Sequence, residues 1–371
     1  MLSPLVRRAR FSDLAEWPAA PLSPALAAFR RSAERFVSGE VRTGDLGLTA
    51  EAFVAAAHAA LAMPSEPSEP AARDFFERHF QPLSLEGEKG GAGFLTGYYE
   101  PVVAASLVRT ARFRYPLYRR PDDLVPVDDV TRPPGLGADF RFARRREDGI
   151  LGEYFDRAAI EAGALSGRGL EIAWLENPVD VFFIHVQGSA RLALPDGRIA
   201  RVGYAAKTGH PFTAIGRLLV EEGELTLAEA DMAGIRRWLA VHPERASGLM
   251  NRNRSYIFFR LADLSDGKDD DTGPLGAANV PLTRYASIAV DRSLHTFGVP
   301  IFVDAESLVV DDRPFRRLAV AQDTGSAILG AARADLFCGS GEAAGALAGG
   351  IRHPARLFAL VPDALWREAR P

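Results

Sequence analysis

Two aspartates near the carboxyl end of the sequence each lie beside a glycine-rich turn. Asp323 is followed by Thr324-Gly325-Ser326, and Asp335 lies twelve residues further on, shortly before Gly339 and Gly341. Two carboxyl groups held together on such turns can do general acid–base chemistry, and each raises the pKa of the other. Either aspartate alone is also an ordinary turn former, because its side chain caps local N–H groups. The pair is therefore a candidate acid–base site.

A third carboxylate, Asp291, follows the apolar run 287–290 and precedes Arg292 and Ser293. An aspartate beside an arginine is also a common surface ion pair, which contributes little to stability. The residues alone leave both interpretations open.

The segment 93–101 gathers side chains that suit a carbohydrate. It contains Thr96, Tyr98, Tyr99 and Glu100 among glycines. Tyrosine rings stack on sugar faces, and tyrosine hydroxyls form hydrogen bonds. The alternative is a barrel strand with two half-buried tyrosines.

Two further segments carry polar side chains. Gln187, Gly188 and Ser189 follow an apolar run and place an amide and a hydroxyl where they can donate to a polyol ligand. A simple turn is the alternative interpretation. Tyr204 and Lys207 lie in a glycine-bounded segment that lacks the G-K-[ST] ending of a phosphate loop.

The elements that must position these residues differ along the chain. Apolar residues at three- and four-residue spacing predict helices in 11–58, and Phe75, Phe76 and Phe80 indicate another helix before a strand that begins at Phe94. Dense prolines and glycines between 101 and 152 predict a solvated loop.

The middle of the chain contains an apolar run at 181–186, bounded by Asp180 and Gly188. Its β-branched and aromatic residues predict a strand buried on both faces. Further on, Thr226 with Glu229 predicts a capping box in front of a helix that ends at Pro243.

The carboxyl-terminal part of the sequence contains short apolar runs between turns. A strand is predicted at 256–259, and the acidic stretch 263–271 predicts an inter-domain connection. Further short strands are predicted at 287–290, 301–303, 317–321 and 357–361. Short strands separated by glycine-rich turns are typical of a β-barrel.

Length and composition limit the classes of protein. A chain of 371 residues exceeds the usual size of one hydrophobic core, so two domains are expected. A net charge of −4 makes nucleic acid a poor partner. A single cysteine, Cys338, and histidines without metal-ligand spacing indicate no metal and no cofactor. No apolar stretch is long enough to span a membrane.

The amino-terminal segment predicts neither a signal peptide nor a lipid anchor. Arg7, Arg8 and Arg10 are not followed by an apolar core, and no cysteine lies nearby to carry a lipid. An anchored form would need a segment upstream of this sequence.

Together, these segments resemble the membrane-bound lytic murein transglycosylase A family. The resemblance runs from Phe11 to Pro362 and rests on six segments in order: 94–101, 167–174, 186–189, 255–259, 291–293 and 323–341. The sequence departs from the family pattern in three ways: it lacks the lipid-anchor cysteine, and Ala190 and Ser326 each replace a usual glycine.

The resemblance implies a mainly β fold with added helices. A double-psi β-barrel would be formed by both chain ends, with residues 1–100 as its first part and 262–371 as the part that carries the catalytic aspartate. Residues 101–261 would form a smaller, inserted β-barrel domain. A groove between the domains would bind a glycan strand.

The resemblance also implies an activity, namely cleavage of the β-1,4 bond between N-acetylmuramic acid and N-acetylglucosamine in peptidoglycan with formation of a 1,6-anhydro ring. The family's catalytic acid matches Asp335, and two aspartates that line the site match Asp323 and Asp291. The implied location is the periplasm or cell envelope, with outer-membrane association, and partners in cell-wall synthesis or division stay open. The residues expected to bind substrate are Thr96, Tyr98, Tyr99, Glu100, Gln187, Gly188, Ser189, Tyr204, Lys207, Arg292 and Ser293.

One carboxyl group suffices for this reaction. Glycosidases use two, because one must activate water or attack the sugar. Here the muramic acid's own C6 hydroxyl attacks C1, so Asp335 can protonate the leaving oxygen and then accept the hydroxyl proton. Asp335 must be protonated when substrate binds, and like-charge repulsion from Asp323 and Asp291, together with desolvation, would raise its pKa. A glycoside hydrolase and a non-catalytic glycan-binding module are the alternatives.

Overall fold

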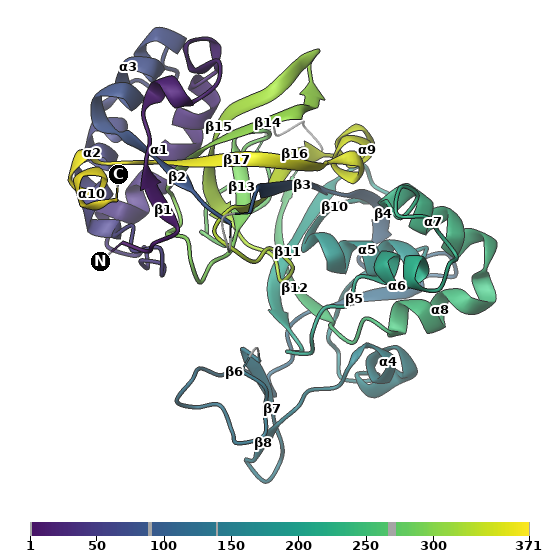
Figure 1. Cartoon of the computed structure of the whole chain (residues 1–371). Helices are drawn as coiled ribbons and strands as arrows, with labels where there is room; N and C mark the ends of the chain where they lie inside the picture. The colour runs from purple at the N-terminus through teal and green to yellow at the C-terminus, as the bar shows by residue number, and fades with distance from the viewer. Residues whose placement is uncertain (1, 88–90, 139, 266–271, 371) are drawn as a thin grey trace. The chain divides into compact units, whose positions relative to one another are not determined.

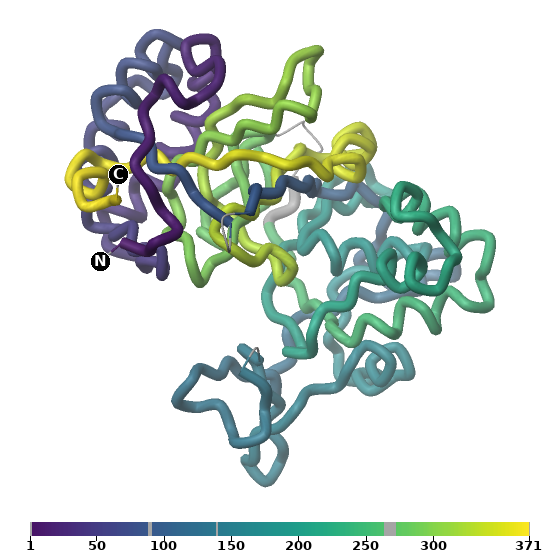
Figure 2. Tube along the Cα trace, viewed as in Figure 1, coloured from purple at the N-terminus to yellow at the C-terminus, as the bar shows by residue number. Residues whose placement is uncertain are grey.

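The computed structural model describes residues 2–87, 91–138, 140–265 and 272–370 (Figures 1 and 2). The chain divides into two compact units. The first comprises residues 1–99, 270–339 and 343–371, and the second comprises residues 100–269 and 340–342. Among the helices of the described residues, none is both long and apolar enough to cross a membrane.

A closed six-stranded barrel forms the centre of the first unit (Figure 1). The barrel strands are β3 (Gly93–Glu100), β13 (Ser287–Val290), β14 (Pro300–Val310), β15 (Arg313–Asp323), β16 (Arg333–Ser340) and β17 (Arg352–Val361). The barrel closes because β17 pairs with β14 on one side and with β3 on the other. β2 (Gln81–Leu85) and β1 (Val6–Arg8) continue the sheet from β17. The strands predicted at 287–290, 301–303, 317–321 and 357–361 are thereby confirmed.

Helices complete the first unit. They are α1 (Ser23–Val37), α2 (Val54–Ala62), α3 (Glu69–His79), α9 (Glu342–Gly350) and α10 (Asp363–Glu368), with short 3₁₀ turns at Phe11–Asp13, Trp17–Ala19 and Ala50–Phe53. Phe29, Phe36, Phe53 and Phe80 form one cluster of aromatic rings in contact and are almost completely buried. This apolar face explains the helical spacing in the sequence.

One buried amide joins helix α1 to the strand that carries Asp323. The Gln322 side chain donates to the Ala28 carbonyl at 2.7 Å and to the Ser32 hydroxyl at 2.8 Å. It accepts from the Ser287 hydroxyl at 2.6 Å. Because each polar atom of this buried side chain is hydrogen-bonded, the end of β15 is held in one position.

A six-stranded sheet forms the centre of the second unit. In order, its strands are β12 (Ile257–Ser265), β11 (Ile199–Lys207), β10 (Ser189–Ala193), β4 (Val102–Ser106), β9 (Glu171–Leu175) and β5 (Tyr115–Tyr118). Arg119, directly after β5, forms a bridge with Phe259 of β12, so the two edge strands meet at this point. A separate three-stranded sheet contains β6 (Leu124–Pro126), β7 (Phe142–Arg145) and β8 (Leu151–Gly152).

The described residues of the second unit also form helices. They are α4 (Arg157–Ala159) with the π-helical turn Ile160–Ala164, α5 (Pro178–Gln187), α6 (Ile215–Glu221), α7 (Met232–Val241) and α8 (Pro243–Asn251). Helices α5 to α8 share an apolar cluster that includes Phe182, Leu219, Trp238 and Leu249.

The prediction of a strand at 181–186 is wrong, because this run lies in helix α5. Asn177 caps the helix by accepting from the Val179 N–H at 2.8 Å, and Pro178 occupies the first turn. Gly188 ends the helix in the left-handed conformation, with φ of 79°. Residues 181–185 are all buried, so the run shows no polar face by which its period could be recognised.

The predicted loop at 101–152 is also wrong, since β4 to β8 lie within it. β4 pairs with β10 and β9, and β5 pairs with β9. These partners lie more than fifty residues away in sequence, so only tertiary pairing turns these short segments into strands.

Two smaller predictions need adjustment. Thr226 and Glu229 do exchange the bonds of a capping box, but they close a turn, and α7 begins at Met232 with Asp231 as its cap. The helix does end just before Pro243, as expected. Strand β12 extends to Ser265, and the rest of the acidic stretch, 266–271, lies outside the described residues.

Candidate active site

Strand pairing in the barrel brings the three candidate aspartates to one end of β13. Ala289 of β13 pairs with Asp323 of β15 on one side and with Asp335 of β16 on the other. Because neighbouring strands lie about 4.8 Å apart, the Cα atoms of the two aspartates are about 10 Å apart across β13. Asp291 follows directly after this strand.

Asp335 is partly buried, and its carboxyl group accepts a short hydrogen bond. The Thr96 hydroxyl donates to Asp335 Oδ1 at 2.5 Å. Burial raises the pKa of Asp335 to about 6, and repulsion from Asp323 adds to this, while the Thr96 bond and the Arg333 charge oppose it. Desolvation is thus the larger of the two effects that the sequence predicted. A carboxyl group with this pKa is protonated in mildly acidic solution and can act as a general acid.

Asp323 is held by three donors. The Tyr98 hydroxyl donates to Oδ2 at 2.9 Å, and the backbone N–H groups of Ala277 and Thr324 donate to Oδ1, each at 2.9 Å. Burial raises the pKa of Asp323, although these three hydrogen bonds lower it in part. Burial also raises the pKa of Tyr98, whose ring lies 5.4 Å from that of Phe337. Tyr98 therefore stays a neutral donor that orients Asp323.

Asp291 has a different environment from the other two aspartates. Ser293 donates to its Oδ1 from the hydroxyl at 2.6 Å and from the backbone at 3.0 Å, and the Gly330 N–H donates to Oδ2 at 2.8 Å. Burial alone would raise the pKa of Asp291, but these hydrogen bonds outweigh it and lower the pKa. Asp291 is therefore an ionised cap that joins the 291–293 turn to the loop before β16. The carboxylate that helps to raise the pKa of Asp335 is Asp323.

The remaining predicted residues of the first unit differ in exposure. Thr96 and Tyr98 share one face of β3 and contact the aspartates. Tyr99 lies on the opposite face and is buried against α9, where a Cβ on Gly345 would come within 2.8 Å of its ring. Arg292 and Ser293 are exposed.

Glu100 is completely buried, which the prediction of a sugar contact did not anticipate. Its carboxylate is paired with Arg191 Nε at 2.8 Å and Arg201 Nε at 2.9 Å, and the Ser340 hydroxyl donates to it at 2.7 Å. The Gly341 N–H also donates to the Glu100 carbonyl at 2.9 Å. A glycan therefore has no access to this carboxylate in the structure.

The other predicted substrate residues belong to the second unit. Gln187 and Gly188 form the end of α5, and Ser189 begins β10 as a buried residue. Ser189 pairs with Gly203 of β11, and Tyr204 is the next residue on that strand. Tyr204 is 43% exposed, whereas Lys207 is half-buried at the end of the same strand.

Arg333, which the sequence did not single out, lies at the site in the structure. Its Nη2 donates to Thr96 Oγ1 at 2.8 Å, and its guanidinium lies 5.6 Å from the ring of Phe94. Arg333 could have been found from its spacing in the sequence, because a residue two positions before Asp335 on a strand lies on the same face as Asp335. Within the part of the chain that the structure describes, no three His, Cys, Asp or Glu side chains could together hold a metal ion.

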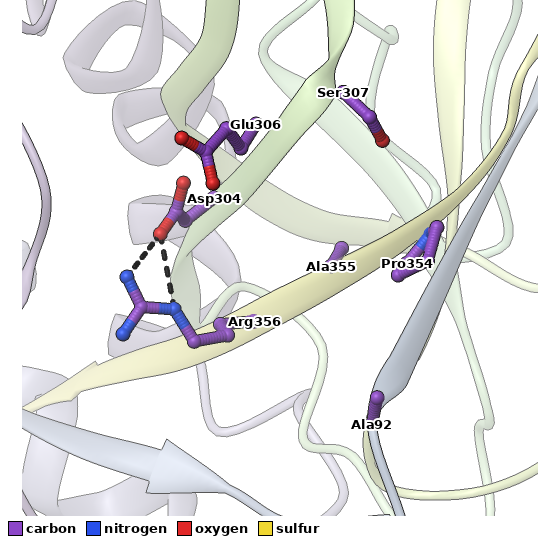
Figure 3. Close-up of a pocket in the computed structure, with 7 residues that line it drawn as sticks. All are labelled: Ala92, Asp304, Glu306, Ser307, Pro354, Ala355 and Arg356. Carbon is purple, nitrogen blue, oxygen red and sulfur yellow. Dashed lines mark hydrogen bonds and ion pairs between the residues drawn. The ribbon is translucent and has the colours of Figure 1, made fainter.

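A shallow pocket of about 500 Å³ on the first unit does not involve these aspartates (Figure 3). Its most buried acidic residue, Asp304, is neutralised by Arg316 Nε at 3.0 Å and Arg356 Nε at 3.1 Å. The Asp304 carboxylate is therefore fully paired. The residues that line it are Ala92, Asp304, Glu306, Ser307, Pro354, Ala355 and Arg356.

Comparison with known proteins gives two family matches, one in the middle of the chain and one near its carboxyl end. The model of the MltA specific insert domain matches residues 94–260, and that of the 3D domain matches residues 286–361. A crystal structure of membrane-bound lytic murein transglycosylase from Agrobacterium tumefaciens is 42% identical, with a TM-score of 0.90, and the match covers 98% of this chain and 99% of that chain.

Two relatives from Escherichia coli add to this comparison. The K12 strain's membrane-bound lytic murein transglycosylase A is 32% identical over 272 residues, which are 71% of this chain and 64% of the relative's length. The chain therefore spans slightly less than two thirds of that protein. A crystal structure of E. coli MltA with bound chitohexaose is 26% identical with a TM-score of 0.66, and the match covers 97% of this chain and 92% of that chain.

These matches confirm the predicted fold class, since the barrel closed by β3 and β17 corresponds to that of the solved relatives. The identity to the A. tumefaciens protein extends over almost the whole of both chains. The chain belongs to the membrane-bound lytic murein transglycosylase A family.

Proposed function

We propose that the chain is a peptidoglycan lytic transglycosylase. It cleaves the β-1,4 bond between N-acetylmuramic acid and N-acetylglucosamine and leaves a 1,6-anhydro ring on the muramic acid. The names of its relatives support the reaction class. The observation that carries the proposal is Asp335, a carboxyl group with a pKa of about 6 that accepts a hydrogen bond from Thr96.

In the proposed reaction, Asp335 acts first as acid and then as base. It donates its proton to the glycosidic oxygen while the bond between that oxygen and C1 of the muramic acid breaks. The C6 hydroxyl of the same muramic acid then attacks C1, and the Asp335 carboxylate accepts the hydroxyl proton. Asp335 is thereby restored to its acid form, and no water is consumed.

Asp323 has an electrostatic role in this proposal. Both of its oxygens already accept hydrogen bonds, from Tyr98 on one side and from two backbone N–H groups on the other. These bonds hold the carboxylate in place and make it poorly suited to abstract a proton from water. A fixed negative charge of this kind stabilises the oxocarbenium-like transition state.

The proposed substrate is a glycan strand of peptidoglycan in the cell envelope. Thr96, Tyr98, Arg292 and Ser293 would bind it from the first unit. The E. coli relative has been crystallised with bound chitohexaose, which is itself a β-1,4-linked amino-sugar chain. The proposed substrate residues of the second unit are Gln187, Gly188, Ser189, Tyr204 and Lys207.

Mass spectrometry of the products released from purified sacculi tests the reaction. The proposal predicts muropeptides with 1,6-anhydro ends, which are lighter than reducing ends by one water. Reducing ends would identify a glycoside hydrolase instead. Sacculi that bind the protein and release nothing would identify a glycan-binding module.

A further inference from the structure

Three side chains at the candidate site form a directed chain of hydrogen bonds. Arg333 Nη2 donates to Thr96 Oγ1 at 2.8 Å, and Thr96 Oγ1 donates to Asp335 Oδ1 at 2.5 Å. Arg333 and Asp335 share one face of β16, and Thr96 lies on the neighbouring strand β3. The mechanism above uses Asp335 and Thr96 but assigns nothing to Arg333.

The direction of these two hydrogen bonds depends on which groups can donate and which can accept. A guanidinium has donors and no acceptor, and a threonine hydroxyl has one proton. Because the guanidinium charge of Arg333 lies beside Thr96 Oγ1 and repels the hydroxyl proton, that proton points away from Arg333 and toward Asp335 Oδ1. Without Arg333 the hydroxyl can rotate and accept a hydrogen bond from the protonated carboxyl group instead.

We propose that Arg333 is a positioning residue that keeps the acidic proton of Asp335 on Oδ2, by fixing the direction of the Thr96 hydroxyl. Oδ1 is then always an acceptor from Thr96, and the proton stays available on the other oxygen for a leaving group. The proposal rests on the proposed function, in which Asp335 is the acid.

The surroundings of Arg333 keep its guanidinium in place. Nη1 donates to the carbonyl of Ala334, and the ring of Phe94 lies 5.6 Å from the guanidinium. Burial lowers the pKa of Arg333, and the charge of Asp335 partly restores it. Arginine keeps its proton even when its pKa is lowered, so the charge and the donors persist at every relevant pH.

The other titratable groups near Asp335 do not replace Arg333. Tyr98 on β3 and Cys338 on β16 have raised pKa values, that of Cys338 at about 12, so both stay neutral near the pKa of Asp335. Asp323 on β15 adds negative charge and raises the pKa of Asp335, whereas Arg333 lowers it. Loss of Arg333 therefore raises the pKa of Asp335 further.

Two pairs of variants test the proposal in the full chain. Arg333→Met removes the donors and keeps much of the side-chain volume, while Arg333→Lys keeps a charged donor. Thr96→Val removes the hydroxyl at nearly constant shape, while Thr96→Ser keeps it. Arg313→Met, at the opposite end of β15 from Asp323, is the matched control for loss of an exposed arginine.

We expect Arg333→Met and Thr96→Val each to lower the release of anhydromuropeptides about tenfold, the loss expected for one hydrogen bond to a charged group. Arg333→Lys and Thr96→Ser restore most of this loss. Arg333→Met combined with Thr96→Val is no slower than Thr96→Val alone, because Arg333 acts through the hydroxyl. Additive losses in this double-mutant cycle overturn the proposal.

A second readout needs no turnover. Carbon-13 NMR of labelled aspartate follows the titration of Asp335 in the free protein, and both Arg333→Met and Thr96→Val should raise its pKa. An unchanged pKa in folded Thr96→Val overturns the proposal even if Arg333→Met does not fold. If the pKa moves as expected while wild-type protein releases no anhydro product, the proposed function fails and the positioning of the proton stands.

Discussion

At the scale of single residues, the balance between burial and hydrogen bonding separates the proposed acid from two chemically identical side chains. Asp335 has a raised pKa because burial disfavours its charged form and, among the described residues, Thr96 alone donates a hydrogen bond to it. Asp291 has a lowered pKa because Ser293 and Gly330 together give it three hydrogen bonds. Asp323 lies between these cases. Asp335 thus accepts fewer hydrogen bonds than Asp323 or Asp291, and this difference separates the proposed acid from its neighbours.

The first prediction concerns Asp335→Asn. The amide cannot donate as a carboxylic acid does, so the variant should keep its fold and its binding to sacculi and lose nearly all turnover. Release of anhydromuropeptides, measured together with the melting temperature, checks this. Asp323→Asn is the comparison and should lower turnover by a smaller factor. Comparable turnover in well-folded Asp335→Asn would refute the assignment of the acid.

The second prediction concerns pH. Turnover should fall as the pH rises above about 6, because Asp335 then loses the proton that it must donate. Initial rates on sacculi between pH 4 and 8 give the profile. In Asp323→Asn the descending limb should move to lower pH, because the like charge that raises the pKa of Asp335 is gone. The assignment fails if this limb stays in place.

The third prediction is a stability measurement at the same residue. The folded pKa of Asp335 is raised, so the folded state binds the additional proton between pH 4 and 6, and stability is lost as the pH rises through this window. Asp335→Asn removes this loss. The variant should therefore gain stability relative to wild type from pH 4 to pH 7, by on the order of 1–2 kcal/mol for a half-buried group. Urea unfolding at both pH values measures the difference, and a constant difference contradicts the burial argument.

At the scale of elements, two strand ends are joined by one buried carboxylate. Glu100 ends β3 and Ser340 ends β16, and the Ser340 hydroxyl donates to Glu100 at 2.7 Å. Arg191 of β10 and Arg201 of β11 neutralise the same carboxylate. The two strands that end here also carry Thr96 and Asp335, so this cluster fixes the elements that position the candidate acid.

The fourth prediction follows from this cluster. Glu100→Gln removes a completely buried carboxylate that pairs with both Arg191 and Arg201, and should destabilise the protein by about 3–5 kcal/mol. Ser340→Ala removes one hydrogen bond and should cost about 1 kcal/mol. Glu176→Gln, in an exposed pair with Arg112, is the control and should have almost no effect. Equal melting temperatures for Glu100→Gln and Glu176→Gln would rule out a structural role for the cluster.

At the scale of the whole molecule, each of the two compact units carries part of the predicted substrate set. The first unit contains the three aspartates with Thr96 and Tyr98, and the second contains Gln187, Ser189 and Tyr204. The proposed function requires residues of both units to bind one glycan strand. Contacts away from the reacting bond position the sugar ring and lower the barrier to the reaction.

The fifth prediction tests this requirement. Gln187→Ala should lower kcat as well as raise KM on sacculi, because a sugar that is bound less firmly is also oriented less well. Val241→Ala, an exposed apolar residue on α7 of the same unit, is the control and should change neither value. A Gln187→Ala variant with unchanged kinetics would remove the second unit from the proposed binding site.

The sequence by itself determined the family and the fold class, because six short motifs in fixed order are a signal that needs no folded coordinates. It also determined the short barrel strands, such as 287–290, whose apolar runs are bounded by glycine turns. These features are local, so each can be recognised within a few residues.

Only the tertiary structure decided the features that depend on distant partners. The run 181–186 became a helix because Asn177 and Gly188 cap it and residues 181–185 are all buried, and its composition alone fits a strand equally well. Glu100 became a buried ion-pair centre because Arg191 and Arg201, about a hundred residues further along the chain, lie within hydrogen-bond distance of its carboxylate. The pKa of Asp335 depends on burial, on Thr96 from more than two hundred residues away in sequence, and on Arg333. Desolvation and hydrogen bonding are properties of the folded surroundings, so composition and spacing cannot supply them.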